Sequence, residues 1–578
     1  MKWITSNNTI IFAPEYNEEL DIQLISGYEI IIFSNHKLNK KIFQSYANDN
    51  FNNIEYKENM FNQNISNLPK TLIQITFGHE FNQDVSKLPP TLTNLTFGYS
   101  FNQDVSNLPH SLTQIIFGNK FNKDVLNLPY SLTQITFGYS FNQDVSNLPY
   151  SLTKIIFGHK FNQDVSNLPH SLTHIIFGFD FNKDVSRLPP YLTDLTFGNW
   201  FNQDVSSLPK GITNLTFNTN FNQNVLSLPK GITHLTFGYT FNQNVSRLPK
   251  EITHLTFGND FNRDVSALPP FLTHLTFGHK FNQNVSKLPN GISHLIFGPN
   301  FNQDVSALPH GLTHLTFGSD FNKNVSNLPQ GIIHLIFGHK FNQNVSELPQ
   351  GIQHLTFGHE FNQNVSNLPQ GITHLIFGWN FNQNVSNLPP FLIYLIFGWS
   401  FNQGVSVLPP TIKYLIFSDR FNHNVSNLPP SLTHLTFGLY FNQDISNLPP
   451  TLTHLTLDKN FNKQCNIPLG IKYLKLNCNN SYVINSLPNS VIELVLGEHF
   501  NLQIDNLPTS IKKLNINRFN IYNKDLNCLP DFIEELHLSC NYQRRIFNIP
   551  SNLKKLICCE IYQYVSDFES KDIEICFM

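Results

Sequence analysis

The chain has 578 residues, a formal net charge of −3 at pH 7 and only 13% charged residues, against roughly 25% in typical soluble domains. It has no Lys/Arg cluster of the size that nucleic acid requires and no run of about 18 apolar residues, so we expect neither nucleic-acid binding nor membrane insertion. Alanine occurs only four times, whereas Phe occurs 53 times, and this composition favours strands over helices.

The first 60 residues are predicted to form an N-terminal cap of degenerate coils. They contain three short apolar segments, at residues 10–12, 30–33 and 54–56, spaced by 21 to 23 residues. We expect each segment to be a strand. No apolar run of signal-peptide length occurs here, and we therefore expect an intracellular, cytoplasmic location.

From residue 61 to residue 460, one 20-residue sequence repeats twenty times without insertion or deletion. Every copy begins with Phe-Asn and has Pro at position 9. A fixed period near 20 is typical of a solenoid, in which each repeat is one coil that buries its apolar side chains only against its neighbours. We predict a mainly β, right-handed solenoid of 20-residue coils with one parallel β-sheet.

The apolar residues of one coil indicate a single strand. In the coil 101–120 they stand at positions 1, 5, 8, 12, 15 and 17, and positions 15 and 17 have the two-residue spacing of a strand. The segment from position 12 to position 17 is the predicted strand. Pro at position 9 has no N–H group, so the return side of the coil should be extended or turn-like. Phe at positions 1 and 17 should stack from coil to coil as two aromatic columns.

Three further positions are predicted to shape the turns. Gly at position 18 in most copies suggests a turn residue with positive φ. Asn at position 2 in every copy suggests a stacked amide column that satisfies backbone groups. Position 4 is Asp in the seven coils from Asp84 to Asp204 and often Asn elsewhere. Stacked acids also occur in calcium-binding β-rolls, but the exchange with Asn favours an Asx-turn, which needs an acceptor oxygen and no charge.

Position 14 should face solvent, and it is His in eight consecutive coils and Tyr in the next two. It is open whether this row is a ladder multiplied by repeat duplication, a partner-binding surface or a metal site. Metal binding is the weakest interpretation, because zinc needs three or four converging ligands. Stacked imidazoles disfavour each other's protonation, so the row should be neutral near pH 7 and gain charge as the pH falls. With two exposed indoles at position 19, the candidate interaction face comprises His234, His254, His274, His294, His314, His334, His354, His374, Tyr394, Tyr414, Trp379 and Trp399.

The pattern Leu-Pro-x-x-Leu-x-x-Leu-x-Phe, as in residues 88–97, is leucine-rich-repeat-like. Together with the Phe-Asn-Gln start and the Leu-Thr-His-Leu-Thr-Phe-Gly segment, it resembles FNIP-repeat proteins, a leucine-rich-repeat-like family of social amoebae and giant amoeba-infecting DNA viruses. The resemblance covers residues 61–460. It departs from the family in its shorter period of 20 and in the Gln that follows Phe-Asn. It implies a leucine-rich-repeat-like solenoid.

Beyond residue 460 the repeat becomes irregular. Five more Ile-Pro or Leu-Pro pairs, from Ile467-Pro468 to Ile549-Pro550, each precede a strand-like segment, so residues 461–578 are predicted to be degenerate coils and a C-terminal cap. All seven cysteines lie here, and the odd number argues against a disulfide framework. The effector ubiquitin ligases are thiol enzymes that join such repeats to a separate catalytic domain. Here the repeats run to Ile549-Pro550 and leave too few residues for such a domain. We interpret Cys558, Cys559 and Cys576 as small apolar fillers.

These patterns favour a non-enzymatic scaffold that binds a protein partner, of unknown identity, through its exposed sheet face. We expect no cofactor and no metal, because no phosphate-binding loop, Gly-x-Ser-x-Gly or His-Glu-x-x-His motif is present. The alternative function is a ubiquitin-pathway substrate adaptor, by analogy with relatives that carry an F-box ahead of the repeats. Residues 1–60 lack the Leu-Pro-x-Glu helical pattern of an F-box. A helical bundle there would favour the adaptor, and further β-coils would disfavour it.

Overall fold

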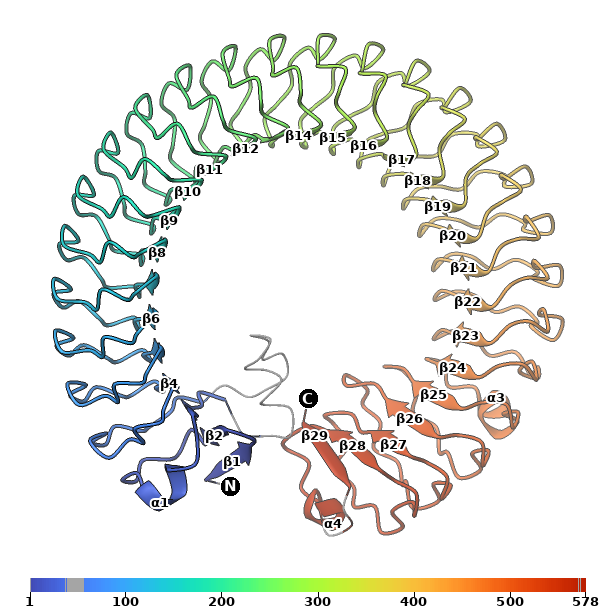
Figure 1. Cartoon of the computed structure of the whole chain (residues 1–578). Helices are drawn as coiled ribbons and strands as arrows, with labels where there is room; N and C mark the ends of the chain where they lie inside the picture. Colours follow the sequence, from blue (N-terminus) through green and yellow to red (C-terminus); the bar gives the residue numbers. More distant parts are fainter. Residues whose placement is uncertain (1, 37, 39–56, 570, 572, 578) are drawn as a thin grey trace. The chain divides into compact units, whose positions relative to one another are not determined.

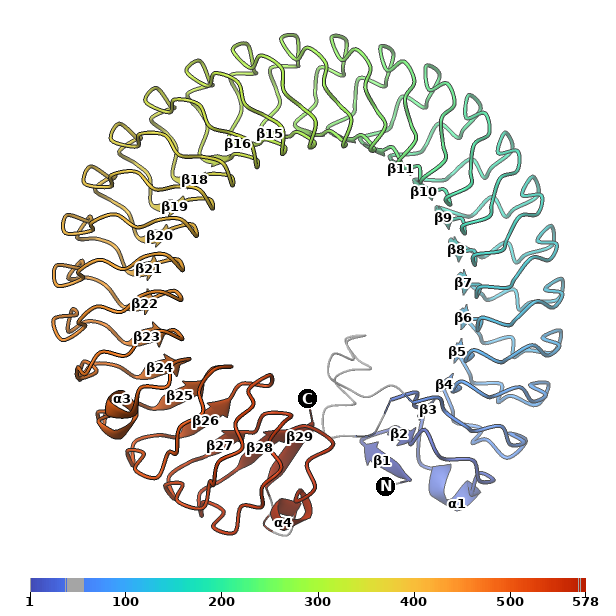
Figure 2. The same cartoon turned by 180° about the vertical axis from the view of Figure 1, so that it is seen from behind.

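The structure is a computed structural model that describes residues 2–36, 38, 57–569, 571 and 573–577. It contains two compact units, Met1–Ile292 (unit 1) and Ser293–Met578 (unit 2). In each unit the strands lie on the inner side of the coils and the turns on the outer side (Figures 1 and 2). The division predicted at residues 60 and 460 separates regular from degenerate repeats, whereas the two units are separated by compactness. The predicted division therefore stays a prediction.

Unit 1 begins with β1 (Trp3–Ser6), β2 (Thr9–Phe12), the short helix α1 (Ile22–Ile25) and β3 (Ile30–Phe33). The strands predicted at 10–12 and 30–33 are confirmed as β2 and β3, which pair in parallel. The third predicted strand, at 54–56, lies outside the described residues. The described part of residues 1–60, where a helical bundle was considered, contains three strands and one four-residue helix. β1 was not predicted, and it pairs antiparallel with β2. Asn7, with φ of 48°, supplies the left-handed conformation that a two-residue hairpin turn requires.

The remaining strands of unit 1 recur every 20 residues, and consecutive strands pair in parallel without a shift of register. They are β4 (Gln74–Thr76), β5 (Asn94–Thr96), β6 (Gln114–Ile116), β7 (Gln134–Thr136), β8 (Lys154–Ile156), β9 (His174–Ile176), β10 (Asp194–Thr196), β11 (Asn214–Thr216), β12 (His234–Thr236), β13 (His254–Thr256) and β14 (His274–Thr276).

Unit 2 continues the same pattern, and each of the five Ile-Pro or Leu-Pro pairs beyond residue 460 precedes a strand. Its strands are β15 (His294–Ile296), β16 (His314–Thr316), β17 (His334–Ile336), β18 (His354–Thr356), β19 (His374–Ile376), β20 (Tyr394–Ile396), β21 (Tyr414–Ile416), β22 (His434–Thr436), β23 (His454–Leu457), β24 (Tyr473–Leu476), β25 (Glu493–Leu496), β26 (Lys513–Ile516), β27 (Glu535–His537), β28 (Lys555–Cys558) and β29 (Glu574–Phe577). The helices α3 (Ser481–Asn485) and α4 (Ser566–Glu569) lie on the outer side (Figure 2).

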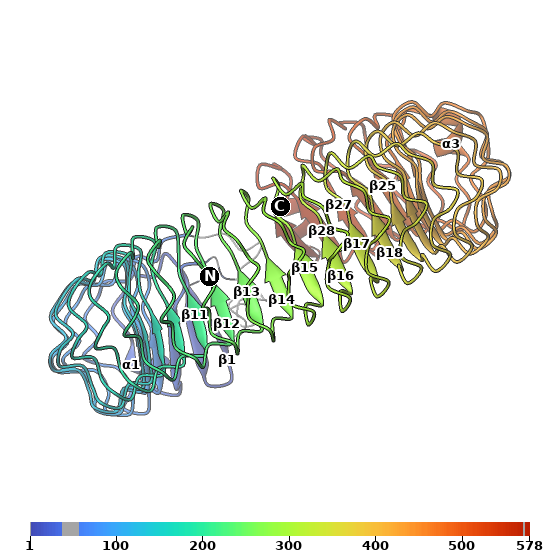
Figure 3. The same ribbon diagram turned by 90° about the horizontal axis from the view of Figure 1, so that it is seen from above.

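Each regular strand is shorter than predicted, with three residues at positions 14 to 16 in β4 to β22 and a fourth, Leu457, in β23. The backbone bonding nevertheless extends beyond both ends of the strand. Thr113 N–H donates to Thr93 O at 2.9 Å, and Phe97 N–H donates to Ile116 O in the next coil at 2.8 Å. Figure 3 shows the resulting ladders from above, with β11 to β13 side by side in unit 1 and β16 to β18 in unit 2.

The core is the set of six apolar positions predicted from the repeat. In the coil 101–120, all six of these side chains are at most 5% exposed. The two predicted Phe columns merge into one continuous stack, because Phe97 at position 17 lies 3.6 Å from Phe101 at position 1 of the next coil, centroid to centroid. Rings within one column are farther apart, as in the 5.7 Å between Phe77 and Phe97.

The prediction for Gly at position 18 was wrong. Among the described residues no glycine has a positive φ. Glycine predominates because the backbones of adjacent coils approach each other closely here: a Cβ on Gly118 would lie 1.6 Å from Gly98 O. Asn218 fills this position in one coil and donates from Nδ2 to Phe197 O at 2.8 Å.

The predicted roles of positions 2 and 4 are confirmed. The Asn102 N–H donates to Oδ1 of Asn82 in the preceding coil at 2.8 Å, and the same bond recurs along the array. Asp84 Oδ1 accepts from Ser86 N–H at 2.9 Å, which is an Asx-turn. This bond and the one from the Ser86 hydroxyl lower the pKa of Asp84 below its usual value.

Candidate functional site

The structure places the predicted row at position 14 on the exposed side of the strands, as a stack of rings. In unit 2 the centroids of neighbouring imidazoles from His294 to His374 lie 4.2 to 4.4 Å apart, with planes tilted by 10° to 21°. The stack loosens at the tyrosines: His374 to Tyr394 is 5.7 Å and Tyr394 to Tyr414 is 6.0 Å. It tightens again from Tyr414 to His434, at 4.3 Å. We call these residues, through His454, the ring row.

The histidines of unit 1 form a shorter stack of the same kind. His234, His254 and His274 are separated by 4.3 and 4.2 Å. The isolated His174 lies instead beside a carboxylate, with Nε2 3.2 Å from Asp194 Oδ2. Position 14 is therefore a ring surface only where the repeat supplies rings in consecutive coils.

Most imidazoles of the ring row are held by the preceding residue. The Thr313 hydroxyl lies 2.9 Å from Nδ1 of His314, and Thr373 and Thr433 hold His374 and His434 at the same distance. The threonine file at position 13, which the sequence explains by strand propensity alone, thus also fixes the orientation of the rings.

Burial and stacking make the ring row reluctant to take up protons. Partial burial is the main cause that lowers the pKa of His314 and of His354, and the neighbouring histidines lower it further. Burial also lowers the pKa of His434, with His454 as the second cause. The direction agrees with the expectation of a row that is neutral near pH 7.

The two indoles of the candidate face stack on each other at the end of the strands. Trp379 and Trp399 lie 4.8 Å apart, and the Arg420 guanidinium covers the Trp399 ring at 4.0 Å. Stacking of His359 on Trp379 at 5.4 Å extends this group toward earlier coils. The sequence placed these indoles beside Tyr394 and Tyr414, whereas their ring contacts are with position 19 of adjacent coils. We call Trp379, Trp399 and Arg420 the indole group.

The sheet surface between β15 and β22 has almost no formal charge. At positions 13, 14 and 16 of the coils from Ser293 to Thr436, the only charged side chain is Lys413, and none is a carboxylate. Position 16 is Ile in three consecutive coils, at Ile376, Ile396 and Ile416. An apolar strip therefore lies beside the ring row in the coils that also carry the indole group.

The coils after β24 have a very different surface, which the sequence reading missed. Glu534 pairs with Lys512 at 3.0 Å and with Lys554 at 2.7 Å, and Glu535 pairs with Lys513 at 3.2 Å. The two lysines lower the pKa of Glu534 to about 2. These residues, with Ile492, Lys555 and Glu574, line an open depression of about 340 Å³. The sequence feature that could have predicted these ion pairs is the alternation of Lys-Lys and Glu-Glu from one coil to the next. We call this surface the charged ladder.

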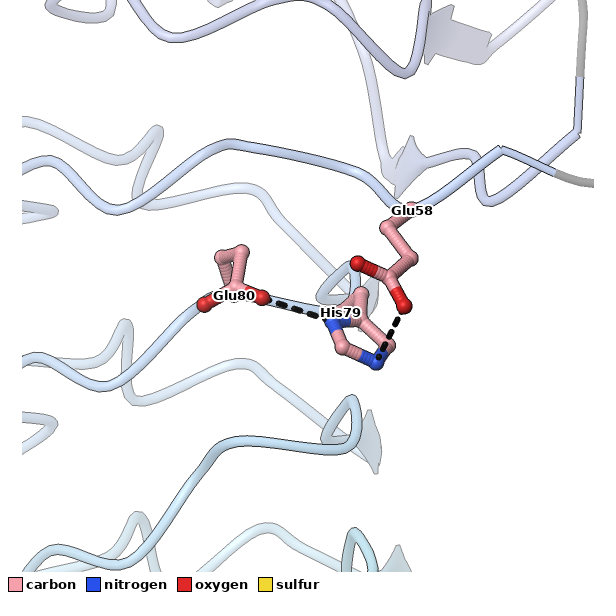
Figure 4. Close-up of side chains that lie close together, drawn as sticks. All are labelled: Glu58, His79 and Glu80. Carbon is pink, nitrogen blue, oxygen red and sulfur yellow. Dashed lines mark hydrogen bonds and ion pairs between the residues drawn. The ribbon is translucent and has the colours of Figure 1, made fainter.

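A second cluster that the sequence reading missed lies in unit 1, where Glu58, His79 and Glu80 meet (Figure 4). His79 Nδ1 lies 2.8 Å from Glu80 Oε1, and its Nε2 lies 3.5 Å from Glu58 Oε1. The two carboxylates therefore approach opposite nitrogens of one ring, Glu80 in a hydrogen bond and Glu58 at ion-pair distance. One metal ion would need the three ligand atoms to converge on a single point.

The cysteines of the last coils include two with strongly raised pKa values. Burial raises the pKa of the Cys478 thiol to about 12 and that of Cys558 to about 11. A thiol with such a pKa is almost fully protonated near pH 7 and is a poor nucleophile. This fits the packing role predicted for Cys558. Among the described residues, no helix has the length and apolar character needed to cross a membrane.

Comparison with solved structures finds a protein of the same architecture from a giant virus. CroV588, described as a novel circular LRR protein, is 36% identical, with a TM-score of 0.72 over 93% of this chain and 96% of that chain. YopM from Yersinia enterocolitica is 18% identical, with a TM-score of 0.40 over 80% and 90% of the two chains. The Toll–Spatzle complex from Drosophila gives 11% identity and a TM-score of 0.45 over 86% and 87%.

Comparison with curated proteins finds no match. The sequence pattern described as FNIP Repeat does match, in overlapping segments that together span residues 84–180 and 201–519. The matched segments thus include regular coils of both units and the first degenerate coils of unit 2. The predicted leucine-rich-repeat-like solenoid and the predicted family are confirmed, and the chain belongs to the FNIP repeat family.

Proposed function

We propose that the chain is a non-enzymatic scaffold that binds a partner protein through the exposed sheet face of unit 2. The observation that carries this proposal is the contrast between the ring row and the charged ladder on the same sheet. The charged ladder pairs its own cations and anions, whereas between β15 and β22 positions 13, 14 and 16 carry rings, isoleucines and small polar side chains, with Lys413 as the one charged side chain.

The composition of this surface supports a protein partner. Tyr, Trp and Arg are the residue types that dominate binding energy at protein interfaces, particularly where they are close together. Tyr394, Tyr414 and the indole group all lie in the coils 361–420, next to the strip of three isoleucines. The rings are already stacked, so little side-chain entropy would be lost on binding.

Affinity capture from cells tests the proposal with three forms of the full chain. The first is unchanged, the second carries His→Asn at all eight consecutive histidines from His234 to His374, and the third carries Trp379→Ala with Trp399→Ala. A Lys554→Gln chain serves as the matched control, because it alters the charged ladder on the same sheet. We expect at least one protein to bind the unchanged and control chains and to be lost from a face variant with an unchanged thermal midpoint.

The proposal fails if no captured protein depends on these side chains. It also fails if Lys554→Gln removes the same proteins as the face variants do, since the charged ladder would then be the binding surface.

A further inference from the structure

The turn that precedes each strand carries coil positions 10 and 11 outward. Leu132 N–H donates to Pro129 O at 3.2 Å, and Ile212 N–H donates to Pro209 O at 3.4 Å. Each bond closes a β-turn whose two central residues are at positions 10 and 11. These corner residues lie at the surface, and position 10 is exposed in every regular coil of unit 1.

The turns of neighbouring coils stack directly on one another. The Ser151 hydroxyl donates to Leu132 O of the preceding coil at 2.6 Å, and a Cβ on Gly231 would lie 3.4 Å from Lys210 O. Because the coils repeat without a shift of register, the side chains at position 10 form a row. We call positions 10 and 11 of the coils from residue 121 to residue 280 the turn edge.

The turn edge carries the four most exposed aromatic side chains of the regular coils in unit 1. Their exposed fractions of 66% to 81% show that they protrude from the turns. Unlike the rings of the ring row, none of them has a ring partner among the described residues. They are Tyr130, Tyr150, Tyr191 and Phe271.

The same edge carries an unpaired row of positive charge. Lys210, Lys230 and Lys250 occupy position 10 in three consecutive coils, and among the described residues none of them makes an ion pair. Adjacent coils are only about 4.8 Å apart at their strands, so these like charges repel each other. Glu251 is the one acidic side chain of the turn edge, and Arg247, at position 7, adds a fourth cation to this stretch. The stretch therefore has a net positive charge that an external anion can neutralise.

We propose that the turn edge binds the surface of an anionic lipid membrane, with its lysines on the headgroups and its aromatic side chains in the interface. Clusters of about four or more Lys and Arg side chains attract anionic lipids, and exposed aromatic side chains settle at the level of the headgroups. Such a contact lies on the membrane surface and needs no membrane-spanning segment. It is separate from the partner surface proposed for unit 2.

Two other ligands fit this pattern less well. A protein partner holds aromatic anchors in well-packed pockets, whereas these side chains protrude from the corners of turns. Single-stranded nucleic acid has a phosphate at every base, so its sites combine cations and stacking rings along one track. Here the two kinds of side chain are largely separated along the edge, because Tyr130, Tyr150 and Tyr191 all precede the lysine row.

Sedimentation with vesicles tests the inference on the full chain. Vesicles of phosphatidylcholine alone are compared with vesicles that also contain phosphatidylserine, at an ionic strength of about 0.1 M. We expect at least about tenfold stronger binding to the phosphatidylserine vesicles, and a loss of at least about tenfold in Lys210→Gln, Lys230→Gln, Lys250→Gln. Tyr130→Ser with Tyr150→Ser should weaken this binding roughly threefold. Thermal midpoints should not change, because the substituted side chains are exposed.

The matched control removes three charges at another position of the coil, position 3, with Lys123→Gln, Lys183→Gln and Lys323→Gln, all of which are exposed. It should bind the vesicles as the unchanged chain does. An equal loss in the control would show attraction by net charge alone and would overturn the inference.

Equal binding to both kinds of vesicle, or binding to neither, would overturn it as well. If polyglutamate or single-stranded DNA binds as tightly as the phosphatidylserine vesicles, and the tyrosine substitutions have no effect, the turn edge attracts anions in general and the membrane is not its ligand.

Discussion

Two stretches of the sheet in unit 2 expose the same coil positions to water but cover them with different chemistry. Between β15 and β22, position 14 carries stacked imidazole and phenol rings, and the face has no carboxylate. Between β25 and β28, the residues in register with it are Glu493, Lys513, Glu535 and Lys555. The second face pairs its own cations and anions, whereas the first carries stacked rings and a single charged side chain, Lys413, at positions 13, 14 and 16.

The coils beneath the two faces also differ. Most regular coils have Gly at position 18, where the backbones of adjacent coils nearly touch. In the last coils this point is occupied by Asn477 and Asn517, with Gly497 between them. Their core replaces Phe with Tyr522 and Tyr542, both fully buried. Gly at position 18 thus predominates beneath the face with few charges between β15 and β22, whereas ion pairs join neighbouring coils of the terminal face.

The largest expected effect comes from adding one carbon to the regular coils. In Gly358→Ala, the Cβ would lie 1.8 Å from Gly338 O, so the two coils must separate. We expect the free energy of unfolding to fall by about 3 kcal/mol, measured by thermal or urea denaturation.

The matched control for this change is Gly371→Ala, where the nearest atom to the new Cβ is Gln350 O at 3.6 Å, an ordinary contact. This variant should be nearly as stable as the unchanged chain. Equal stability losses in the two variants would show that close stacking at position 18 does not hold the regular coils together.

The periodicity of the sequence was sufficient to predict the coil but not how coils meet. The six buried positions, the Asn column and the Asx-turns follow from bonds within a coil or between identical positions, and a repeat displays these directly. The role of Gly118 depends on the distance between backbones, which residue spacing does not encode. The hairpin of β1 depends on the single residue Asn7 and lies outside the repeats, so periodicity does not predict it.

For the candidate site, the sequence predicted which rings face solvent but not their hydrogen bonds. The exposure of position 14 follows from the alternation of the strand. The contact of Thr313 with His314 required the rotamers of both side chains. The pairing of Glu58 with His79 joins residues from different coils in a part of the chain where the period is irregular, so no spacing rule indicates it.

A substitution in the core of the last coils should raise the free energy of unfolding, by less than Gly358→Ala lowers it. The Tyr522 side chain is fully buried, and its hydroxyl lacks a hydrogen-bond partner among the described residues. Phe, which occupies this position in every regular coil, removes a buried polar group and keeps the ring. We expect Tyr522→Phe to raise the free energy of unfolding by about 1 kcal/mol. A loss of stability in thermal denaturation would mean that the hydroxyl is bonded, for instance to a buried water molecule.

Mild acid should destabilise the fold through the histidines of the ring row. The pKa values of His314, His354, His434 and His454 lie below the ordinary 6.5, so the unfolded chain binds protons more readily than the folded chain. Stability is then complete above about pH 6.5 and falls as the pH decreases toward the folded pKa values. We expect a lower thermal midpoint near pH 5 than near pH 7, and a smaller decrease when all four residues are Asn. Identical midpoints at the two pH values would contradict the direction of these pKa shifts.

The smallest effect at neutral pH is expected in the charged ladder. Lys512 and Lys554 depress the pKa of Glu534 from 4.5 to about 2, so its contribution is present above about pH 4.5 and is lost as the pH falls toward 2. Glu534→Gln should therefore lower the thermal midpoint slightly at pH 7 and not at all near pH 2, and added salt should reduce the difference because the pairs are exposed. Lys555→Gln, which keeps the pairs of Glu534, is the control. A loss that is equally large in high salt would show that Glu534 acts through packing, and the contrast between an uncharged regular face and a charge-paired terminal face would then lose its electrostatic basis.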